Sequence, residues 1–399
     1  MATLTTLDAA LKIQYLPGVV EQLNQERSWY SKIEKQTEGW AGRQLFWTTH
    51  TQRSGGWGSR AEAGGLPRRG AQAVAGPNLT AKYLWGRINL TEQVMHASTK
   101  DQSMVGSAMD FEMEGLMNDL KRDSNRQLMD GNGNGALCLT NGTGSSAATV
   151  TVDTPGTQFV EVGSYIDSFT AEASGGSTGI TAQQVTGKTA TTLTLGGNES
   201  WANNEFISYE GSRGNEWLGL RGIVDDGTVV GTLYGIDRTT TANAYWRARV
   251  SDNGTTNRPL TEVLLQTVID DIEDNSDANA DDIDWILSGR PVRRQYMNIL
   301  VPDKRFINTM DLGGGFKALE YNGKAWIADR DVRPNQVYLL NSKSFKFAQL
   351  APLSWMDKDG SILHRSTSDD GSYDAAAYVF GELKCDAPNR NGLLSDITE

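Results

Sequence analysis

A helical pattern running from Thr99 to Asp130 restricts what this chain can fold into more than any other feature of the sequence. Thr99 followed by Gln102 fits the capping box that opens helices, and Gly131 directly after Asp130 supplies a stop. Between them, apolar side chains recur at three- and four-residue steps and so share one stripe: Val105, Met109, Met113, Leu116 and Leu120. At about 1.5 Å per residue the helix would be roughly 45 Å long. It is either an ordinary long core helix or a spine shared with neighbouring subunits.

The same helix contains two glycines and a set of polar residues. Gly106 and Gly115 each cost up to about 1 kcal/mol relative to Ala, so we expect a bend or a close backbone contact at these positions. The polar residues fall off the apolar stripe: Asp110, Glu114, Asn118 and Lys121.

A long hairpin is predicted over residues 43–90. Gln44–His50 is strand-like, and on the return Tyr83, Trp85 and Arg87 alternate with apolar residues, which is the period of a strand. Between these strands lie more than about 20 Gly-rich residues without periodicity, a length that is uncommon for a loop inside a compact domain. The loop is therefore either disordered or ordered by lying on another molecule.

The charges of this loop favour the second interpretation. The loop has four arginines and one acid, Glu62, in a chain whose net charge is −12. A basic loop on an acidic body is complementary to a copy of itself. We therefore predict contacts between subunits at the loop and at the returning strand, made by Arg53, Trp57, Arg60, Arg68, Arg69, Tyr83 and Trp85.

The second half of the chain changes character twice. Residues 145–212 are rich in Thr, Ser and Gly, with short alternating runs between Gly/Asn turns, which is typical of a small antiparallel barrel or sandwich. Because the chain resumes its earlier character afterwards, we interpret this stretch as an insertion. An amphipathic helix is then expected near Thr261–Asp274, a buried strand at Asp284–Leu287 and a helix at Pro291–Leu300, followed mainly by strands.

Composition bounds the function. The chain has 399 residues, enough for two or three domains, and its negative charge disfavours generic binding to nucleic acid. Its two cysteines, Cys138 and Cys385, match neither a metal site nor a disulfide framework. We find no signal peptide and no apolar run of membrane-spanning length. A reducing cytosol fits these features.

No catalytic constellation is evident, so we expect neither an enzyme nor a cofactor nor a resident metal. The three histidines, His50, His96 and His364, lie in different segments and are interpreted as surface or packing residues. The glycines after the long helix lack the preceding strand and the following Lys-Ser/Thr of a phosphate-binding loop. An acidic run over 270–284 is read as a solvated helix end, with a divalent-cation site or a docking site for the basic loop as the alternatives.

In this order, the elements resemble the major capsid proteins of tailed bacteriophages, which have the Hong Kong-ninety-seven-like fold. The Gly/Arg-rich hairpin resembles that family's extended loop, and Thr99–Asp130 resembles its spine helix. Similar strings are the helix exit from Arg126 to Gly135, Gly219–Asp225 and Val337–Asn341. No single string is specific, and the resemblance depends on their order over nearly the whole chain.

The resemblance implies an α+β fold and an icosahedral shell built from pentamers and hexamers around double-stranded DNA. The expected parts are an N-terminal arm (1–42), the extended hairpin loop (43–90), the spine helix with the first part of a peripheral domain (91–144), the inserted β-barrel domain (145–212), an axial domain (213–330) and the return strands of the peripheral domain (331–399). The expected location is the virion, assembled in the bacterial cytoplasm, with portal, scaffolding and decoration proteins as partners and no membrane.

Two departures from the family refine this expectation. Some relatives join a loop lysine covalently to an Asn of a neighbour, but residues 51–80 contain no lysine and Lys82 lies on the returning strand. We therefore expect no isopeptide bond and a shell held by non-covalent contacts. Some relatives also begin with a helical scaffolding segment, whereas this sequence begins almost directly with the arm, which favours a separate scaffolding protein.

Two alternatives remain open on the sequence. An encapsulin-like nanocompartment would keep the fold and enclose enzyme cargo instead of a genome. A β-rich tail or adhesin protein would use the insertion to bind host glycans and would form elongated trimers.

Overall fold

The computed structural model describes residues 28–37, 39–40, 42–62, 64–94, 108–171, 179–276, 283–300, 309–312, 316–357, 361–366 and 371–398. The chain divides into two compact units. The larger unit comprises Glu26–Leu84, Asp123–Pro352 and Val379–Glu399, and the smaller unit comprises Met1–Gln25, Trp85–Arg122 and Leu353–Tyr378. Four elements contribute residues to both units: β6 (Lys82–Thr91), α3 (Ala108–Asp130), β21 (Phe345–Trp355) and β23 (Ser372–Cys385).

The predicted long helix is confirmed over α3, which ends at Asp130 as expected. Its 23 residues span about 35 Å at the usual rise. The expected start, with the capping box at Thr99 and Gln102, lies outside the described residues, as does Gly106. Gly115 has open space where a Cβ would be, so of the two expected alternatives, a bend or a close backbone contact, the contact is wrong.

Two glycines explain how α3 packs and ends. In the smaller unit, a Cβ on Gly86 of β6 would lie 2.8 Å from Leu116 Cδ1, so the apolar stripe of the helix rests directly on this strand. In the larger unit, the Gly131 amide donates to the Gln127 carbonyl at 2.9 Å. A Cβ on Gly131 would lie 2.5 Å from the Trp217 carbonyl oxygen, so only glycine allows this close approach.

A seven-stranded mixed sheet forms one core of the larger unit. Its order is β15 (Arg249–Ser251), β24 (Gly392–Leu394), β20 (Val337–Leu340), β16 (Trp285–Ser288), β19 (Lys324–Ala328), β18 (Phe316–Tyr321) and β17 (Thr309–Leu312). The β15–β24 and β16–β19 pairs are parallel and the other pairs are antiparallel. This sheet takes β20 and β24 from beyond residue 330, where the sequence analysis placed the end of the axial domain.

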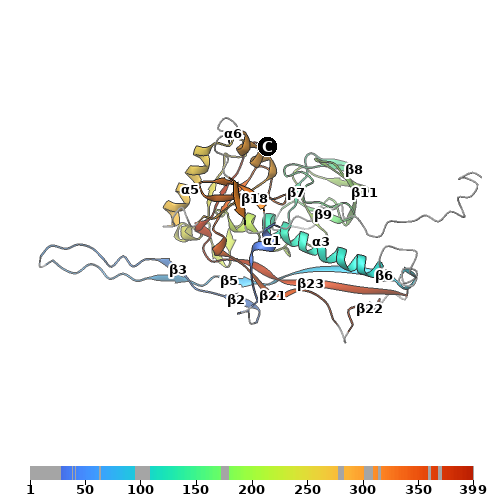
Figure 1. Cartoon of the computed structure of the whole chain (residues 1–399), viewed down its shortest axis with the longest axis horizontal. Coiled ribbons are helices and arrows are strands. Elements are labelled where there is room, and N and C mark those ends of the chain that lie inside the picture. The colour runs from blue at the N-terminus through green and yellow to red at the C-terminus, as the bar shows by residue number, and fades with distance from the viewer. Residues whose placement is uncertain are drawn as a thin grey trace, which may run out of the picture. The chain divides into compact units, whose positions relative to one another are not determined.

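Helices α5 (Glu262–Ser276) and α6 (Arg290–Leu300) lie beside this sheet (Figure 1). Both match the helices expected from the sequence. Thr261 caps α5 by accepting a hydrogen bond from the Leu264 amide at 3.1 Å. The buried face of α5 packs so closely on β24 that a Cβ on Gly392 would lie 2.5 Å from Ile272 Cδ1. The core around these helices contains Leu265, Val268, Ile269, Ile272, Ile286, Val292 and Leu339.

The expected β insertion forms a six-stranded sheet. Its order is β7 (Cys138–Leu139), β12 (Phe206–Tyr209), β9 (Tyr165–Phe169), β10 (Gln183–Lys188), β11 (Thr192–Trp201) and β8 (Gly144–Thr151). A bridge between Thr140 and Val152 and a hydrogen bond from the Asp153 amide to the Leu139 carbonyl join the two ends of this order. The sheet therefore closes into a small barrel, which removes its free edges. Its interior contains Val150, Ile166, Val185, Leu193 and Ile207.

The remaining elements connect these parts. β1 (Glu34–Gln36) pairs in parallel with β21, β22 (His364–Arg365) pairs with β23, and β6 also pairs with β23. The hairpin is built from β2 (Gln44–Phe46) with β5 (Asn78–Thr80) and β3 (Thr49–Gln52) with β4 (Ala73–Ala75). Short elements complete the chain: α1 (Ser28–Lys32), α4 (Leu220–Ile223), β13 (Thr232–Leu233), β14 (Ile236–Asp237), and the 3-10 helices η2 (Thr241–Trp246), η5 (Ser342–Ser344) and η6 (Pro388–Arg390).

Candidate assembly surfaces

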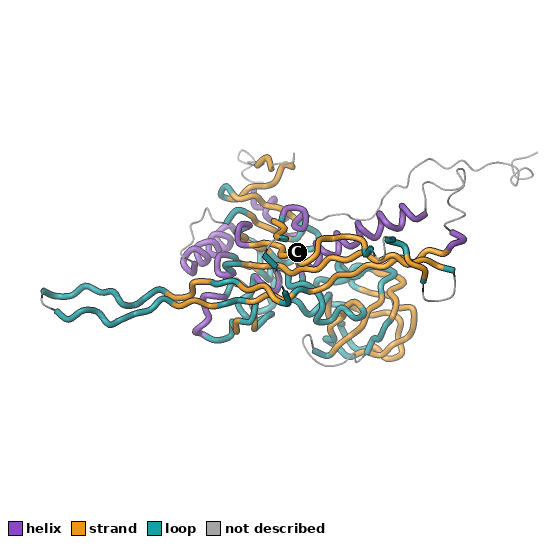
Figure 2. The backbone as a smooth tube through the Cα atoms, turned by 90° about the horizontal axis from the view of Figure 1, so that it is seen from below, coloured by secondary structure: helices purple, strands orange, loops and turns teal. Residues whose placement is uncertain are grey.

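The predicted hairpin is a narrow two-stranded projection of the larger unit. Figure 1 shows it leaving the body of that unit beyond β2 and β5, and Figure 2 shows irregular backbone (teal) beyond the short ladder of β3 and β4. The two sides of the hairpin, called its arms below, stay together in the irregular part. Their backbones approach so closely that a Cβ on Gly70 would lie 2.3 Å from the Gly56 amide nitrogen. The His50 ring also bonds to the Gln72 side chain at 2.6 Å across the arms. The glycines therefore allow close pairing of the two arms, which their lack of periodicity did not predict.

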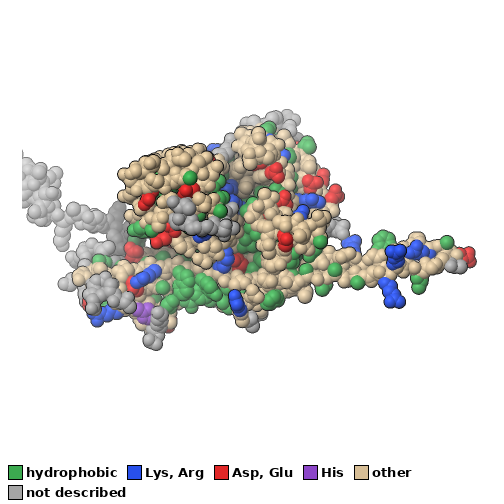
Figure 3. Space-filling view, turned by 180° about the vertical axis from the view of Figure 1, so that it is seen from behind, with side chains coloured by type: hydrophobic (Ala, Val, Ile, Leu, Met, Phe, Trp, Pro, Cys, Tyr) green, Lys and Arg blue, Asp and Glu red, His purple; other side chains and the backbone are tan. Residues whose placement is uncertain are grey.

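The hairpin tip, defined as residues 53–72, exposes apolar and cationic side chains together. Trp57 is 82% exposed and Leu66 is 92% exposed. Arg60, Arg68 and Arg69, called the tip arginines below, are also exposed, and Figure 3 shows cationic side chains gathered toward the end of the hairpin. Exposed large apolar side chains next to positive charge are typical of a surface that binds another protein. This is where the structure places the predicted contact residues Arg53 and Trp57.

The other two predicted contact residues lie on β6 and have aromatic neighbours within the chain. Tyr83 meets Phe380 edge to face at 4.9 Å in the larger unit. Trp85 meets Tyr378 at 5.5 Å in the smaller unit. Tyr83 remains 55% exposed and Trp85 remains 49% exposed, so about half of each side chain faces solvent. Tyr83 and Trp85 alternate along β6 with less exposed positions, as the period of the sequence predicted.

The root of the hairpin is fixed by a partly buried lysine. Lys82 donates from Nζ to the carbonyl oxygens of Gly133 at 2.8 Å and Glu216 at 2.6 Å. Burial lowers the pKa of Lys82, and the nearby Glu382 and Glu216 carboxylates oppose this shift. Lys82 therefore ties the returning strand to the segments that follow α3, and its amine is not presented to solvent at the tip.

A cavity of about 460 Å³ lies beside this root, and Lys82 and Glu382 lie on its wall. Glu382 is buried, and its Oε1 accepts hydrogen bonds from the Leu218 amide at 2.7 Å and the Leu383 amide at 3.1 Å. Burial raises the pKa of Glu382 to about 8, although Lys82 opposes the shift. A carboxyl group here is therefore largely protonated at neutral pH.

Buried ion pairs fasten the last turns of α3. Arg126 binds Glu216 through two hydrogen bonds of 3.0 and 2.8 Å and binds Asp123 at 2.7 Å. Arg333 binds Asp130 through two hydrogen bonds of 2.6 and 3.1 Å. A buried charge without such a partner would cost several kcal/mol, so these pairs fix which segments meet the helix. The sequence pattern did not indicate them, because they join residues far apart in the chain.

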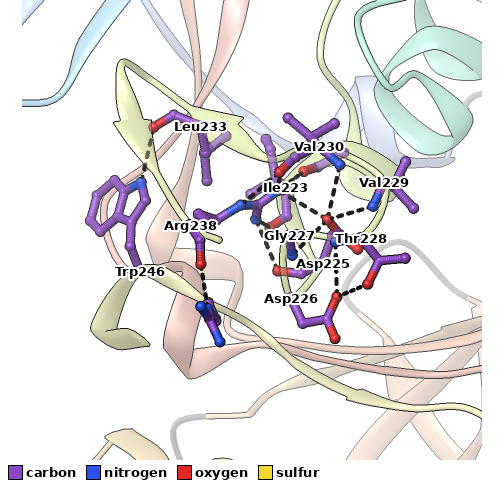
Figure 4. Close-up of polar contacts among 12 residues, drawn as sticks. Ile223, Asp225, Asp226, Gly227, Thr228, Val229, Val230, Leu233, Arg238 and Trp246 are labelled. Carbon is purple, nitrogen blue, oxygen red and sulfur yellow. Dashed lines mark hydrogen bonds and ion pairs between the residues drawn. The ribbon is translucent and has the colours of Figure 1, made fainter. Parts of the chain in front are cut away.

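A second buried arginine, Arg238, holds residues 222–238 together (Figure 4). This segment, called the turn below, contacts the base of the hairpin. Arg238 is fully buried and donates to the carbonyl oxygens of Gly222, Ile223, Asp225 and Val230 and to the Asp225 carboxylate at 3.2 Å. Burial lowers the pKa of Arg238, and the Asp225 carboxylate opposes the shift.

This turn contacts the base of the hairpin directly. The Asn78 amide donates to the Tyr234 carbonyl at 2.9 Å, and the rings of Trp47 and Tyr234 lie 5.3 Å apart. Trp246 in turn donates from Nε1 to the Leu233 carbonyl at 3.2 Å (Figure 4). The Arg238 network therefore sets the position from which the hairpin leaves the larger unit.

The described end of the N-terminal arm lies on its own chain. Trp29 is 1% exposed, with ring centroids 5.4 Å from Trp285 and 5.7 Å from Phe345. β1 then pairs with β21. α1 is too short to be stable alone, and in this segment its support comes from the same subunit. The residues before Ser28 lie outside the described part.

Clusters that could hold a metal ion are absent from the described residues, because no three of their His, Cys, Asp or Glu side chains are close enough together. The acidic run considered as a cation site lies partly on α5, and residues 277–282 of it are outside the description. None of the described helices has the length and apolar character that a bilayer crossing requires.

Solved structures of other proteins share this architecture, although comparisons by sequence find no match. No protein-family model matches the chain, and no curated protein matches it by sequence. Among solved structures, the capsid asymmetric unit of cyanophage A-1(L) is similar with a TM-score of 0.62, 12% identity and complete coverage of both chains. The capsid of a native GTA particle is similar with a TM-score of 0.56 and 6% identity, over 100% of this chain and 99% of the other.

The chain has the phage-capsid fold. The resemblance seen in the sequence is thus confirmed for the fold, as is the α+β class. The same fold occurs in the holo-SrpI encapsulin complex of Synechococcus elongatus PCC 7942, which is similar with a TM-score of 0.50 and 7% identity over 100% of this chain and 96% of the other. The likeness therefore establishes the fold, which the phage capsids and this encapsulin share.

Proposed function

We propose that this chain is the major capsid protein of a tailed bacteriophage and assembles into pentamers and hexamers around double-stranded DNA. The observation that carries the proposal is the hairpin tip, which presents Trp57, Leu66 and the tip arginines to solvent on a body with the phage-capsid fold. Its cationic character complements the net charge of −12 on the whole chain. A second copy is therefore the partner that fits it.

Several weak contacts per subunit are sufficient for a closed shell. Each hairpin buries apolar side chains at roughly 25 cal/mol per Å² on a neighbour, and each neighbour contributes a hairpin in return. Once one contact forms, the others become intramolecular and their effective concentrations rise. Net negative charge also suits a DNA container, because a wall that bound the genome tightly would hinder packing and ejection.

The shell is held by non-covalent contacts. The tip has no lysine, and Lys82 is engaged with two carbonyl oxygens at the hairpin root. Purified particles should therefore dissociate to single chains on denaturing gels, and a ladder of covalent multimers would contradict the proposal. The further partners are a scaffolding protein and a portal, with assembly in the bacterial cytoplasm and the virion as the final location.

Electron microscopy of the expressed chain tests the proposal. We expect closed spherical shells, formed alone or with a co-expressed scaffolding protein, and nuclease-protected DNA in particles from infected cells. Elongated trimers would instead support a tail or adhesin protein.

The encapsulin neighbour makes a nanocompartment the second candidate. Shells that contain a defined protein cargo and no protected DNA would favour it.

A further inference from the structure

The arm is held in place by one buried amide side chain. Asn125 Oδ1 accepts hydrogen bonds from the backbone amides of Trp29 at 3.2 Å and Tyr30 at 3.1 Å. Its Nδ2 donates to Asp331 Oδ2 at 2.7 Å and Asp329 Oδ2 at 3.3 Å. Because the arm offers only donors, the oxygen of Asn125 must face it and the amino group must face the two aspartates.

The two aspartates behind Asn125 form a buried acidic pair. Asp329 is fully buried and Asp331 nearly so, and the Asp331 amide donates to Asp329 Oδ1 at 2.9 Å. Burial, and then the neighbouring Asp329 charge, raise the pKa of Asp331 to about 7, against the hydrogen bond from Asn125 and the charges of Arg330 and Arg126.

The other charged groups near Asn125, Asp329 and Asp331 have contacts of their own. Arg126, on α3, is itself bound to Asp123 and Glu216. Arg330 lies 3.5 Å from a Glu161 oxygen. On the arm, Lys32 lies over the Trp285 ring and Lys35 over the Tyr30 ring. None of these cations makes a direct ion pair with Asp331 among the described residues.

We propose that Asn125, Asp329 and Asp331 form a protonation-dependent latch for the arm segment Trp29–Gln36. With Asp331 protonated, the pair carries one charge, Oδ2 still accepts from Asn125, and the arm stays docked. When Asp331 loses its proton, two negative charges lie side by side in a buried site, and the Asn125 amino group donates to both of them. Water relieves that repulsion only where the covering arm withdraws, so ionisation favours the undocked arm.

The linkage fixes both the direction and the size of the effect. The docked state has the raised pKa, so it binds the proton more tightly than an open state with a hydrated carboxyl. Docking is therefore strongest at low pH and weakens as the pH rises through about 7. Between pH 6 and pH 8 the docking equilibrium should fall by about tenfold. This inference does not depend on what a shell encloses or on whether one forms.

Hydrogen exchange of the full-length chain tests the latch. Protection of the peptide covering Trp29–Gln36, corrected for the intrinsic pH dependence of exchange, should fall about tenfold from pH 6 to pH 8. The Asp331→Asn variant, which cannot ionise, should show no such fall. The matched control Glu34→Gln removes an exposed carboxylate from the arm itself and should keep the fall.

A second variant covers the case in which Asp331→Asn does not fold. Asp329→Asn removes the like charge beside Asp331, so the fall in protection should move to lower pH. Wild-type protection that does not change with pH would overturn the proposal, as would an unchanged fall in Asp331→Asn or an unmoved fall in Asp329→Asn.

Discussion

Truncating Trp57 should weaken assembly while leaving the single subunit unchanged. Trp57 is 82% exposed, so Trp57→Ala removes almost no packing within the chain. Aromatic side chains bury about 150–250 Å² at a contact, and at roughly 25 cal/mol per Å² the exposed part of this ring gives a ceiling of about 5 kcal/mol on a neighbour. Ordering the tip consumes part of that gain, so we expect a loss of about 2–3 kcal/mol per contact.

The critical concentration for assembly, followed by light scattering and electron microscopy, measures this loss. A change of about 2–3 kcal/mol per contact corresponds to about a 30- to 150-fold weaker contact. The thermal midpoint of the unassembled chain should not change. Val263→Ala is the matched control, because Val263 is 75% exposed but lies on α5. An unchanged critical concentration for Trp57→Ala, or an equal increase for Val263→Ala, would refute the reasoning.

The remaining predictions concern charge, backbone and pH. Reversing the three tip arginines to Glu should block assembly at low salt, whereas wild-type assembly should weaken as salt rises, both measured by light scattering. Gly70→Ala should separate the two arms of the tip, because its Cβ would lie 2.3 Å from the Gly56 amide nitrogen, and exchange of the tip amides should accelerate while the body melts normally. Burial raises the pKa of Glu382 to about 8 from an ordinary value near 4.5, so the folded chain favours the protonated carboxyl. The contribution of Glu382 to the free energy of unfolding is therefore largest below about pH 4.5 and is lost as the pH rises to about 8. Glu382→Gln should flatten the part of this decline between about pH 7 and 8 in urea titrations, and an unchanged slope there would contradict the assignment.

Local periodicity was enough to predict the elements that depend on it. The alternation along β6, the end of α3 at Asp130 and the position of α5 each follow from residues within a few positions of one another. The insertion was likewise visible as short alternating runs. The alternating runs did not distinguish a barrel from a sandwich. The Thr140–Val152 bridge that closes the barrel joins the residues that follow the first and last strands of the sheet order, and local periodicity does not show which strands pair.

Long-range polar contacts could not be predicted in the same way. Asn125, Arg126 and Asp130 occupy the buried end of α3, where their partners come from positions about 90 to 200 residues away. In the sequence they look like the solvated face of a helix, because a polar residue gives no local sign that a distant partner will satisfy it. The signal that could have been used is their number: the last two turns of α3 are too polar to end a core helix without buried partners.

These buried contacts separate the hairpin into a fixed root and an adaptable tip. At the root, Lys82 and the Arg238 network satisfy their donors with backbone carbonyl groups, so the direction in which the hairpin leaves is set by many hydrogen bonds at once. At the tip, the apolar side chains are exposed to solvent. The ladder of β3 and β4 is short, so the two arms of the hairpin can bend together. The proposed assembly into rings of five and of six needs this combination, because a loose root would lose register and a rigid tip would fit only one ring. Arg238→Met should therefore disturb assembly more than its distance from the tip suggests, by broadening the range of shell sizes seen by microscopy, and uniform wild-type shells from this variant would contradict the argument.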